Sequence, residues 1–224
     1  MEPVPALVTL HLWRVSPGQV PAALARMGLD RARIRRTPGV RFAKLLGTGD
    51  GRTFTARDAD PLRWGLLATW ADAGAARDFA VARSWEALAT EVFRADLRPL
   101  VSRGRWSGRA PFGDPTPTRY DGPVAAVTRA RLTARKAATF WRAVPPVSAE
   151  LHRQPGLRAA VGIGEAPVGL QGTFSLWDSP VALREFAHRS PDHVRAIART
   201  ATEGWYAEEL FARFEVLGTS GRLP

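Results

Sequence analysis

Thr37-Pro38-Gly39-Val40 recurs as Gln154-Pro155-Gly156-Leu157, and Leu66-Leu67-Ala68-Thr69-Trp70 recurs as Thr173-Phe174-Ser175-Leu176-Trp177. The first pair is 117 positions apart, counted from Pro38 to Pro155, and the second is 107 apart, counted from Trp70 to Trp177. One insertion in the first copy, within the Gly/Asp-rich stretch 47–61, explains the difference. Residues 7–106 can therefore be laid over residues 124–218 as two copies of one supersecondary unit, because a solenoid repeat would span only about 20–50 residues.

Each copy has the pattern of strand, helix, strand, strand, helix and strand. The helix after the first strand is expected to begin at Ser16 or Thr133 and to end near Gly28 or the Pro145-Pro146 pair. The second helices are expected to begin near residues 73 and 179. The expected strands are 7–15, 40–46, 63–70 and 97–102 in the first copy, and 124–132, 157–163, 169–177 and 211–217 in the second.

This pattern predicts an α+β fold of two fused ferredoxin-like βαββαβ repeats. Each repeat would form a four-stranded antiparallel sheet with both helices on one face, so the bare faces of the two sheets would pack together as a barrel. We assign residues 1–106 to the first repeat, 107–122 to the connection, 123–218 to the second repeat and 219–224 to a tail. Alternation along the first strand separates Val8, Leu10 and Leu12 from Thr9, His11 and Trp13, and one of these sets must line the space between the sheets.

Composition excludes several classes of function. The 224 residues contain no cysteine, which rules out disulfides, thiolate-ligated haem and cysteine nucleophiles. The net charge of +11 comes without an aromatic and basic reader motif, so we expect a solvated basic face, no nucleic-acid partner and at most peripheral membrane contact. Without a long apolar run or a signal-peptide pattern, the expected location is the cytoplasm.

His193 is the strongest candidate for a metal ligand. Ser190-Pro191-Asp192-His193 has the residue order of a helix start, and the apolar Val194, Ile197 and Ala198 share a face with this histidine. The positive end of the helix dipole favours a neutral imidazole, which can ligate a metal. A buried core histidine would show the same pattern. The first copy has Val81 and Glu86 where the second has His188 and His193, so we expect one site per chain, with His188 as the alternative ligand.

Other polar residues are candidates for catalysis or binding. His11 on the first predicted strand could hydrogen-bond in a pocket between the sheets, or be a packed core residue. Glu165 could act as a general base at a hairpin end, or be a solvated turn carboxylate. The connecting segment carries planar guanidinium groups that are suited to hold carboxylates, although they could equally anchor the connection itself. These are Arg103, Arg105 and Arg109.

Several segments together resemble the spheroidene monooxygenase family of carotenoid ketolases. They are Ser102-Arg103-Gly104-Arg105-Trp106-Ser107-Gly108 with Pro111-Phe112, Gly162-Ile163-Gly164-Glu165, Gln171 with Thr173-Phe174-Ser175 and Trp177, and Glu203-Gly204-Trp205-Tyr206 with Glu208-Glu209-Leu210-Phe211-Ala212-Arg213-Phe214. The resemblance covers most of the chain. It implies relation to the dimeric α/β-barrel superfamily, whose haem-binding members carry the proximal histidine on the second helix of a repeat.

The resemblance implies an oxidoreductase that binds one haem b through the iron ligand His193. The expected reaction is monooxygenation of an apolar small molecule, carotenoid-like or a natural-product intermediate, in a pocket between the sheets. An electron-donor protein would supply reducing equivalents, His11 or Glu165 the protons, and the connecting arginines the propionate contacts. The alternatives are redox-neutral haem chemistry, a cofactor-free monooxygenase and a non-catalytic module that binds a hydrophobic ligand. The oligomeric state stays open.

Overall fold

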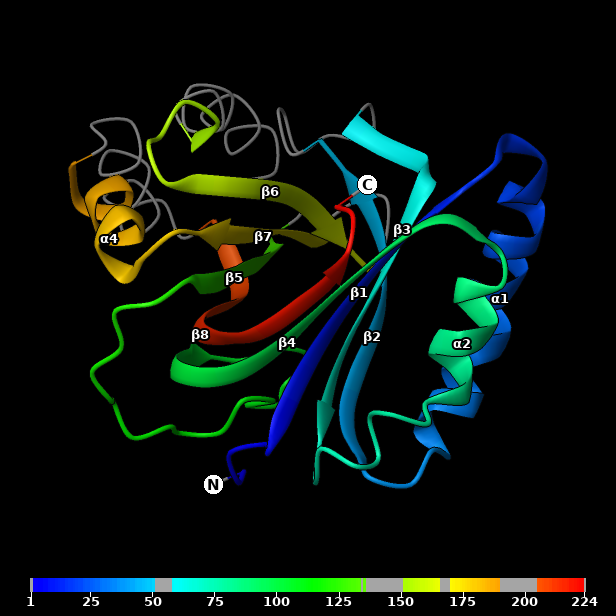
Figure 1. Ribbon diagram of the computed structural model, residues 1–224, viewed down its shortest axis with the longest axis horizontal. Coiled ribbons are helices and arrows are strands. Elements are labelled where there is room, and N and C mark those ends of the chain that lie inside the picture. Colours follow the sequence, from blue (N-terminus) through cyan, green and yellow to red (C-terminus); the bar gives the residue numbers. More distant parts are fainter. Residues whose placement is uncertain are drawn as a thin grey trace.

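The computed structural model describes residues 2–50, 58–133, 135, 151–165, 170–189 and 205–223. Its first half contains β1 (Leu7–Val15), a 3-10 turn (Pro17–Gln19), α1 (Val20–Arg35), β2 (Val40–Gly49), β3 (Ala59–Trp70), α2 (Ala80–Glu86) and β4 (Ala89–Gly104). The second half contains β5 (Val124–Leu132), β6 (Leu157–Gly164), β7 (Leu170–Trp177), α4 (Pro180–Arg189) and β8 (Tyr206–Gly221) (Figure 1).

The strands form one closed antiparallel barrel in the order β1-β3-β2-β6-β7-β5-β8-β4. Each half contributes four neighbouring strands, and the halves join where β2 pairs with β6 and where β4 pairs with β8. The β4–β8 seam is the longer one, because both strands are 16 residues long. The predicted fold class, an α+β barrel of two fused repeats within one chain, is confirmed. The helix expected from Thr133 to the Pro145-Pro146 pair lies largely outside the described residues.

Large apolar side chains fill the interior of the barrel. Val8, Leu10 and Leu12 of β1 point inward and belong to a buried cluster drawn from both halves. Its largest members are Phe42, Phe93, Trp106, Phe112, Phe174 and Phe214. Six aromatic side chains thus pack in the described part of the barrel interior, where the sequence placed a ligand pocket, and the pocket between the sheets stays a prediction.

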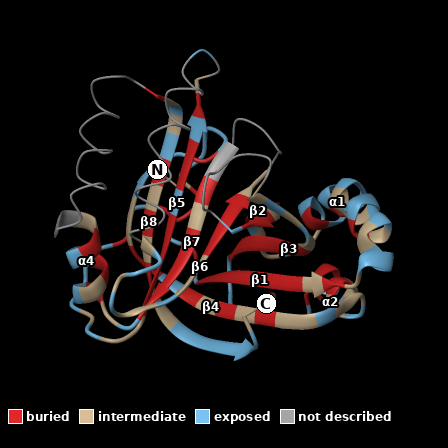
Figure 2. Cartoon of the chain, turned by 90° about the horizontal axis from the view of Figure 1, so that it is seen from above, coloured by how far each residue is buried: buried red, intermediate tan, exposed pale blue. Residues whose placement is uncertain are grey.

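The helices lie outside the barrel. In the first half, α1 and α2 cover the outer face of the sheet, and the buried residues of this layer form a second cluster rich in tryptophan (Figure 1). In the second half, Leu183 and Phe186 of α4 pack on Val124 and Trp177. Figure 2 shows the resulting layers, with mostly buried strands and a largely exposed outer side of α1. No helix in the described ranges is long and apolar enough to cross a membrane.

Two first-half helices differ from their predicted bounds. The first was expected to end at Gly28, but α1 continues through this residue to Arg35, where the basic side chains of its last turn favour the negative end of the helix dipole. One glycine costs a helix about 1 kcal/mol relative to alanine, which burial of Ala23 and Ile34 offsets. The second helix was expected near residue 73, but α2 begins at Ala80, after a turn whose residues are mostly exposed.

Candidate functional site

The two halves can be compared residue by residue on their outer faces, because their strand registers agree. Leu7 pairs with Trp70 in the first sheet, and Val124 pairs with Trp177 in the second. Four residues along β1 and β5 from these pairs, the first sheet has the pair His11 and Leu66 where the second has the pair Thr128 and Thr173. Two residues further along, Trp13 corresponds to Ala130. On the adjoining strands, Leu45 of β2 pairs with Leu66, and Gly162 of β6 pairs with Thr173. Leu45 therefore corresponds to Gly162.

On the first sheet, the outer face is filled by large side chains. Trp13 stacks on Trp85 of α2 with ring centroids 5.1 Å apart, and Trp64 lies 6.1 Å from the same ring. Leu45 and Leu66 are buried beside them. A continuous apolar layer therefore joins the helices to the first sheet, and this outer face serves to pack the helices.

On the second sheet, the corresponding positions hold Thr128, Ala130, Gly162 and Thr173, which we call the small-residue face. Thr128 is exposed although β5 is a central strand between β7 and β8. The side chains of Thr128 and Thr173 make no hydrogen bond to any part of the chain that the structure describes. Strand pairing without large outward side chains gives a flat surface, on which Thr128 is exposed, Thr173 half-buried, and Ala130 and Gly162 buried.

An aromatic ring and a guanidinium group border the small-residue face. Phe211 of β8 pairs with Thr128 and is partly buried, and the Arg103 guanidinium lies over its ring, 5.3 Å from the centroid. Arg103 is thus the member of the predicted arginine group that reaches this face. Arg105 instead donates to the Gly108 carbonyl, and Arg109 pairs with Glu2 at 2.9 Å. These contacts lie within the connection and to the N-terminal segment, and the cofactor-binding role of Arg105 and Arg109 stays a prediction.

Glu165 closes one end of the barrel. Its carboxylate accepts hydrogen bonds from Lys44 at 2.5 Å and from the indole of Trp106, and the Arg129 guanidinium lies 3.4 Å away. The Arg129 side chain is only 4% exposed and also pairs with Glu208. The carboxylate is 15% exposed and held by three donors, so it is not a solvated turn carboxylate, while its role as a general base stays a prediction.

The turn after Trp106 supplies the remaining contacts of this end. Ser107 and Gly108 both have positive φ, 54° and 75°, as the tight turn that joins Trp106 to Arg109 requires. Their backbone amides donate to Glu208 at 2.9 and 2.6 Å. Burial tends to raise the pKa of Glu208, but the amides and the Arg129 guanidinium outweigh it, so this pKa lies below its usual range.

His11 lies outside the barrel interior, between the first sheet and the helices. Its ring stacks on Trp13 with centroids 5.5 Å apart, and neither ring nitrogen has a hydrogen-bond partner in the described chain. Burial and the neighbouring Arg94 guanidinium lower the pKa of His11 from 6.5 to about 3. The sequence left open whether His11 is a packed core residue or a pocket residue, and its position is that of a packed core residue.

Because its pKa is depressed, His11 should make the protein less stable in acid. Between pH 6.5 and about pH 3, His11 is protonated in the unfolded chain but neutral in the folded chain. The free energy of unfolding should therefore fall by about 1.4 kcal/mol for each pH unit as the pH is lowered through this window. His11→Leu should remove this contribution. Urea unfolding at pH 4.5 and 7 would measure it, and an equal pH response of both proteins would contradict the assignment.

The comparisons with known proteins agree with this architecture. The chain is 36% identical to a spheroidene monooxygenase from Rhodobacter capsulatus, over 96% of this chain and 92% of that protein. It is 40% identical to a spheroidene monooxygenase from Rubrivivax gelatinosus, over 82% of this chain and 72% of the relative. The chain belongs to the spheroidene monooxygenase family. It matches no protein-family model.

Among solved structures, the fold of this spheroidene monooxygenase family member is similar to that of an aldoxime dehydratase crystallised with butyraldoxime. The TM-score is 0.62 at 12% sequence identity, over 94% of this chain and 79% of that one. A second aldoxime dehydratase structure gives 0.61, also at 12% identity. At these identities the likeness concerns the fold: a duplicated α/β barrel in a single chain.

Two predicted ligands in this family member cannot be compared with the geometry. His193 lies outside the described residues. The backbone of His188 belongs to α4, but its side chain is not described. In the described ranges, no cluster of three or more His, Cys, Asp or Glu side chains could hold a metal ion. The axial role of His193 therefore stays a prediction.

The small-residue face was missed by inspection of the sequence. The signal was present in the repeat, since aligning the copies gives Thr128 for His11, Ala130 for Trp13 and Thr173 for Leu66. The missing information was which side of each strand points outward, and the packing of Val8, Leu10 and Leu12 into the barrel supplies it.

Proposed function

We propose that this protein is a haem-dependent monooxygenase that inserts oxygen into a carotenoid, and that the small-residue face holds the haem. The observation that carries the proposal is the difference between the outer faces of the two sheets. The first is filled by Trp13, Trp64 and Leu66, whereas the second presents Thr128 and Thr173, with Thr128 exposed. Family membership supports the reaction and the substrate class.

The residues on this face fit a haem group in shape and in charge. A macrocycle is planar, and a strand-paired surface of threonine, alanine and glycine lets it approach the backbone closely. The exposed Arg103 guanidinium at the edge is suited to hold a propionate by paired hydrogen bonds. We assign the axial position to His193, the residue that the repeat comparison singles out in the second half.

When bound, the haem would activate dioxygen with two electrons from a donor, so that one oxygen atom enters the substrate and the other leaves as water. The chain would supply the remaining functions. The ring of Phe211 offers an apolar contact for a polyene. The Thr128 and Thr173 hydroxyls would be further proton donors on this face, beside His11 or Glu165, for which the sequence suggested that role. The apolar barrel core supports the sheet rigidly from behind.

Haem binding through His193 has a direct spectroscopic test. The protein, purified with sufficient haem supply, should show a Soret band and one haem per chain. His193→Ala should lose or shift this band, whereas His152→Ala, which removes an exposed histidine of the same half, should leave it unchanged. Absence of a Soret band in the wild type contradicts the haem proposal.

Other outcomes separate the alternatives. A Soret band that His193→Ala leaves unchanged overturns the axial assignment and directs the same substitution to His188. Turnover of spheroidene with dioxygen by haem-free protein indicates a cofactor-free monooxygenase. Haem binding without turnover, in the presence of dioxygen, reductant and spheroidene, favours redox-neutral haem chemistry. With neither haem nor turnover, the binding-module alternative gains.

A further inference from the structure

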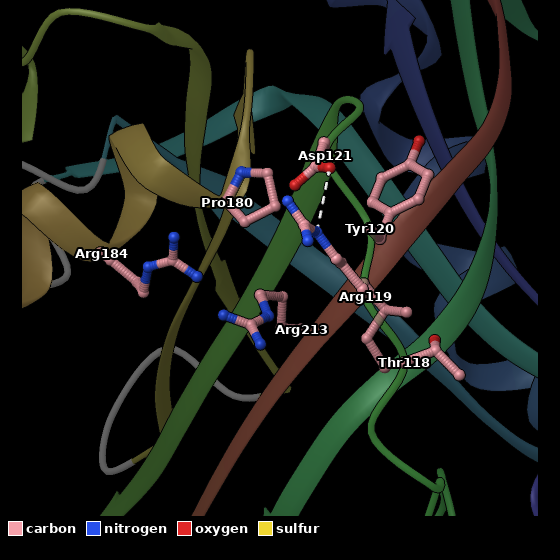
Figure 3. Close-up of a pocket in the computed structure, with 8 residues that line it drawn as sticks. Thr118, Arg119, Tyr120, Asp121, Pro180, Arg184 and Arg213 are labelled. Carbon is pink, nitrogen blue, oxygen red and sulfur yellow. Dashed lines mark ion pairs between the residues drawn. The ribbon is translucent and has the colours of Figure 1, made fainter.

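A pocket outside the small-residue face gathers three arginine side chains. It has a volume of about 230 Å³ and lies between the start of α4, strands β4 and β8, and the connection between the halves (Figure 3). Its lining comprises Leu100, Thr118, Arg119, Tyr120, Asp121, Pro180, Arg184 and Arg213. The function proposed above does not use this pocket.

The positive charge of the pocket is only partly balanced. Arg119 pairs with Asp121 at 3.5 Å, with both side chains at least four-fifths exposed. Arg213 and Arg184 form no ion pair with any residue in the described ranges, and the buried Nε of Arg213 lacks a hydrogen-bond partner there. Figure 3 shows the Arg184 and Arg213 guanidinium groups turned toward each other across the pocket. Three guanidinium groups thus face one carboxylate.

Two cations held this close destabilise each other unless an anion lies between them. The repulsion is visible in the pKa of Arg213, which burial and the neighbouring Arg184 lower from its usual value. Nothing in the fold requires the pair, because α4 is already anchored through Leu183 and Phe186. A guanidinium offers a planar fork of donors that matches carboxylate and phosphate oxygens.

We propose that this pocket is an oxyanion-binding site, in which Arg184 and Arg213 together hold a carboxylate or phosphate group and Arg119 strengthens the positive field. Arg213 provides the inner contact, since its Nε is buried and unused, and Arg184 closes over the anion from α4. Asp121 acts against binding by neutralising Arg119. The proposal does not depend on the haem or on the reaction.

Isothermal titration with inorganic phosphate at low salt tests this site. Arg213→Gln should weaken phosphate binding by about tenfold or more, because charge-assisted hydrogen bonds to the anion are lost. Arg184→Gln, on the exposed side of α4, should weaken it by several fold without risk to folding. Asp121→Asn should strengthen binding about threefold, since it removes the competing carboxylate. The control Arg77→Gln removes an exposed arginine of the first half and should change nothing.

A second measurement separates two sources of the anion. Sedimentation with vesicles of neutral lipid, or of neutral lipid mixed with phosphatidic acid, shows whether a lipid phosphate enters the pocket. If Arg184→Gln loses binding to phosphatidic-acid vesicles and Arg77→Gln keeps it, the pocket binds a lipid headgroup. If both variants lose vesicle binding equally while the phosphate titration still depends on Arg184 and Arg213, the pocket binds a soluble anion. Phosphate binding that is undetectable, or equally strong in Arg184→Gln, Arg213→Gln and Arg77→Gln, overturns the proposal.

Discussion

Thr128→Trp should reduce kcat/KM for a carotenoid by at least about 100-fold, a loss of roughly 3 kcal/mol of transition-state stabilisation. The indole would occupy the surface on which we place the haem, and would restore bulk where the first sheet has His11 beside Trp13. Because Thr128 is exposed on a central strand, the larger side chain meets no packed core, and β-strands accept tryptophan well. Stability should therefore change little while activity is lost.

The matched control is Thr219→Trp. Thr219 is also an exposed strand threonine, on β8 opposite Ala95, and it lies away from the small-residue face. Steady-state turnover and urea unfolding of both variants measure the effect. Equal activity of the two tryptophan variants would contradict the location of the site, and a large loss of stability in Thr128→Trp would mean that this face is packed rather than open.

Arg129→Leu should cost about 3 kcal/mol of unfolding free energy, because it removes a buried cation and leaves the half-buried carboxylates of Glu165 and Glu208 without it. Lys44 would still pair with Glu165, whereas Glu208 would keep, among the described residues, the two backbone amides of the tight turn. Arg129→Lys should cost less, since a single ammonium retains the charge while losing the fork that reaches both carboxylates.

Chemical denaturation gives this cost directly, with Arg158→Leu as the control. Arg158 pairs with Asp178 at 2.5 Å, but the two side chains are 49% and 57% exposed, so its loss should cost about 1 kcal/mol or less. A comparable, small cost for both substitutions would show that the charged cluster does not hold the end of the barrel. Activity should fall in Arg129→Leu only as far as the folded fraction does.

The repeat made the fold predictable. Matching Pro-Gly turns and strand-end tryptophans, Trp70 and Trp177, define two equivalent units, and closure follows because each unit leaves one face of its sheet uncovered. The end of α1 was not predictable, since burial of its apolar side chains outweighs the local preference of Gly28. The apolar interior draws on residues far apart in the sequence, such as Phe42 and Phe174 of one buried cluster, and periodicity does not predict which distant residues share a cluster.

The candidate site was only half accessible from the sequence. The comparison of copies pointed to the second half through His188 and His193, which stays a prediction, and alternation alone could not decide which side of β1 faces outward. His11 and Glu165 stood out as isolated polar residues, although one packs among tryptophans and the other closes the barrel through Lys44. Thr128 and Thr173 carry no distinctive chemistry, and only their position on an open strand face makes them notable.

The most direct test is a crystal structure of the protein purified with haem and soaked with spheroidene. The account predicts density for the haem against Thr128, Thr173 and Gly162 on the outer face of the second sheet, with His193 on the iron. It predicts none at the equivalent face of the first sheet, where Trp13 and Trp64 occupy the space. Density for either molecule inside the barrel, or against the first sheet, would contradict the account.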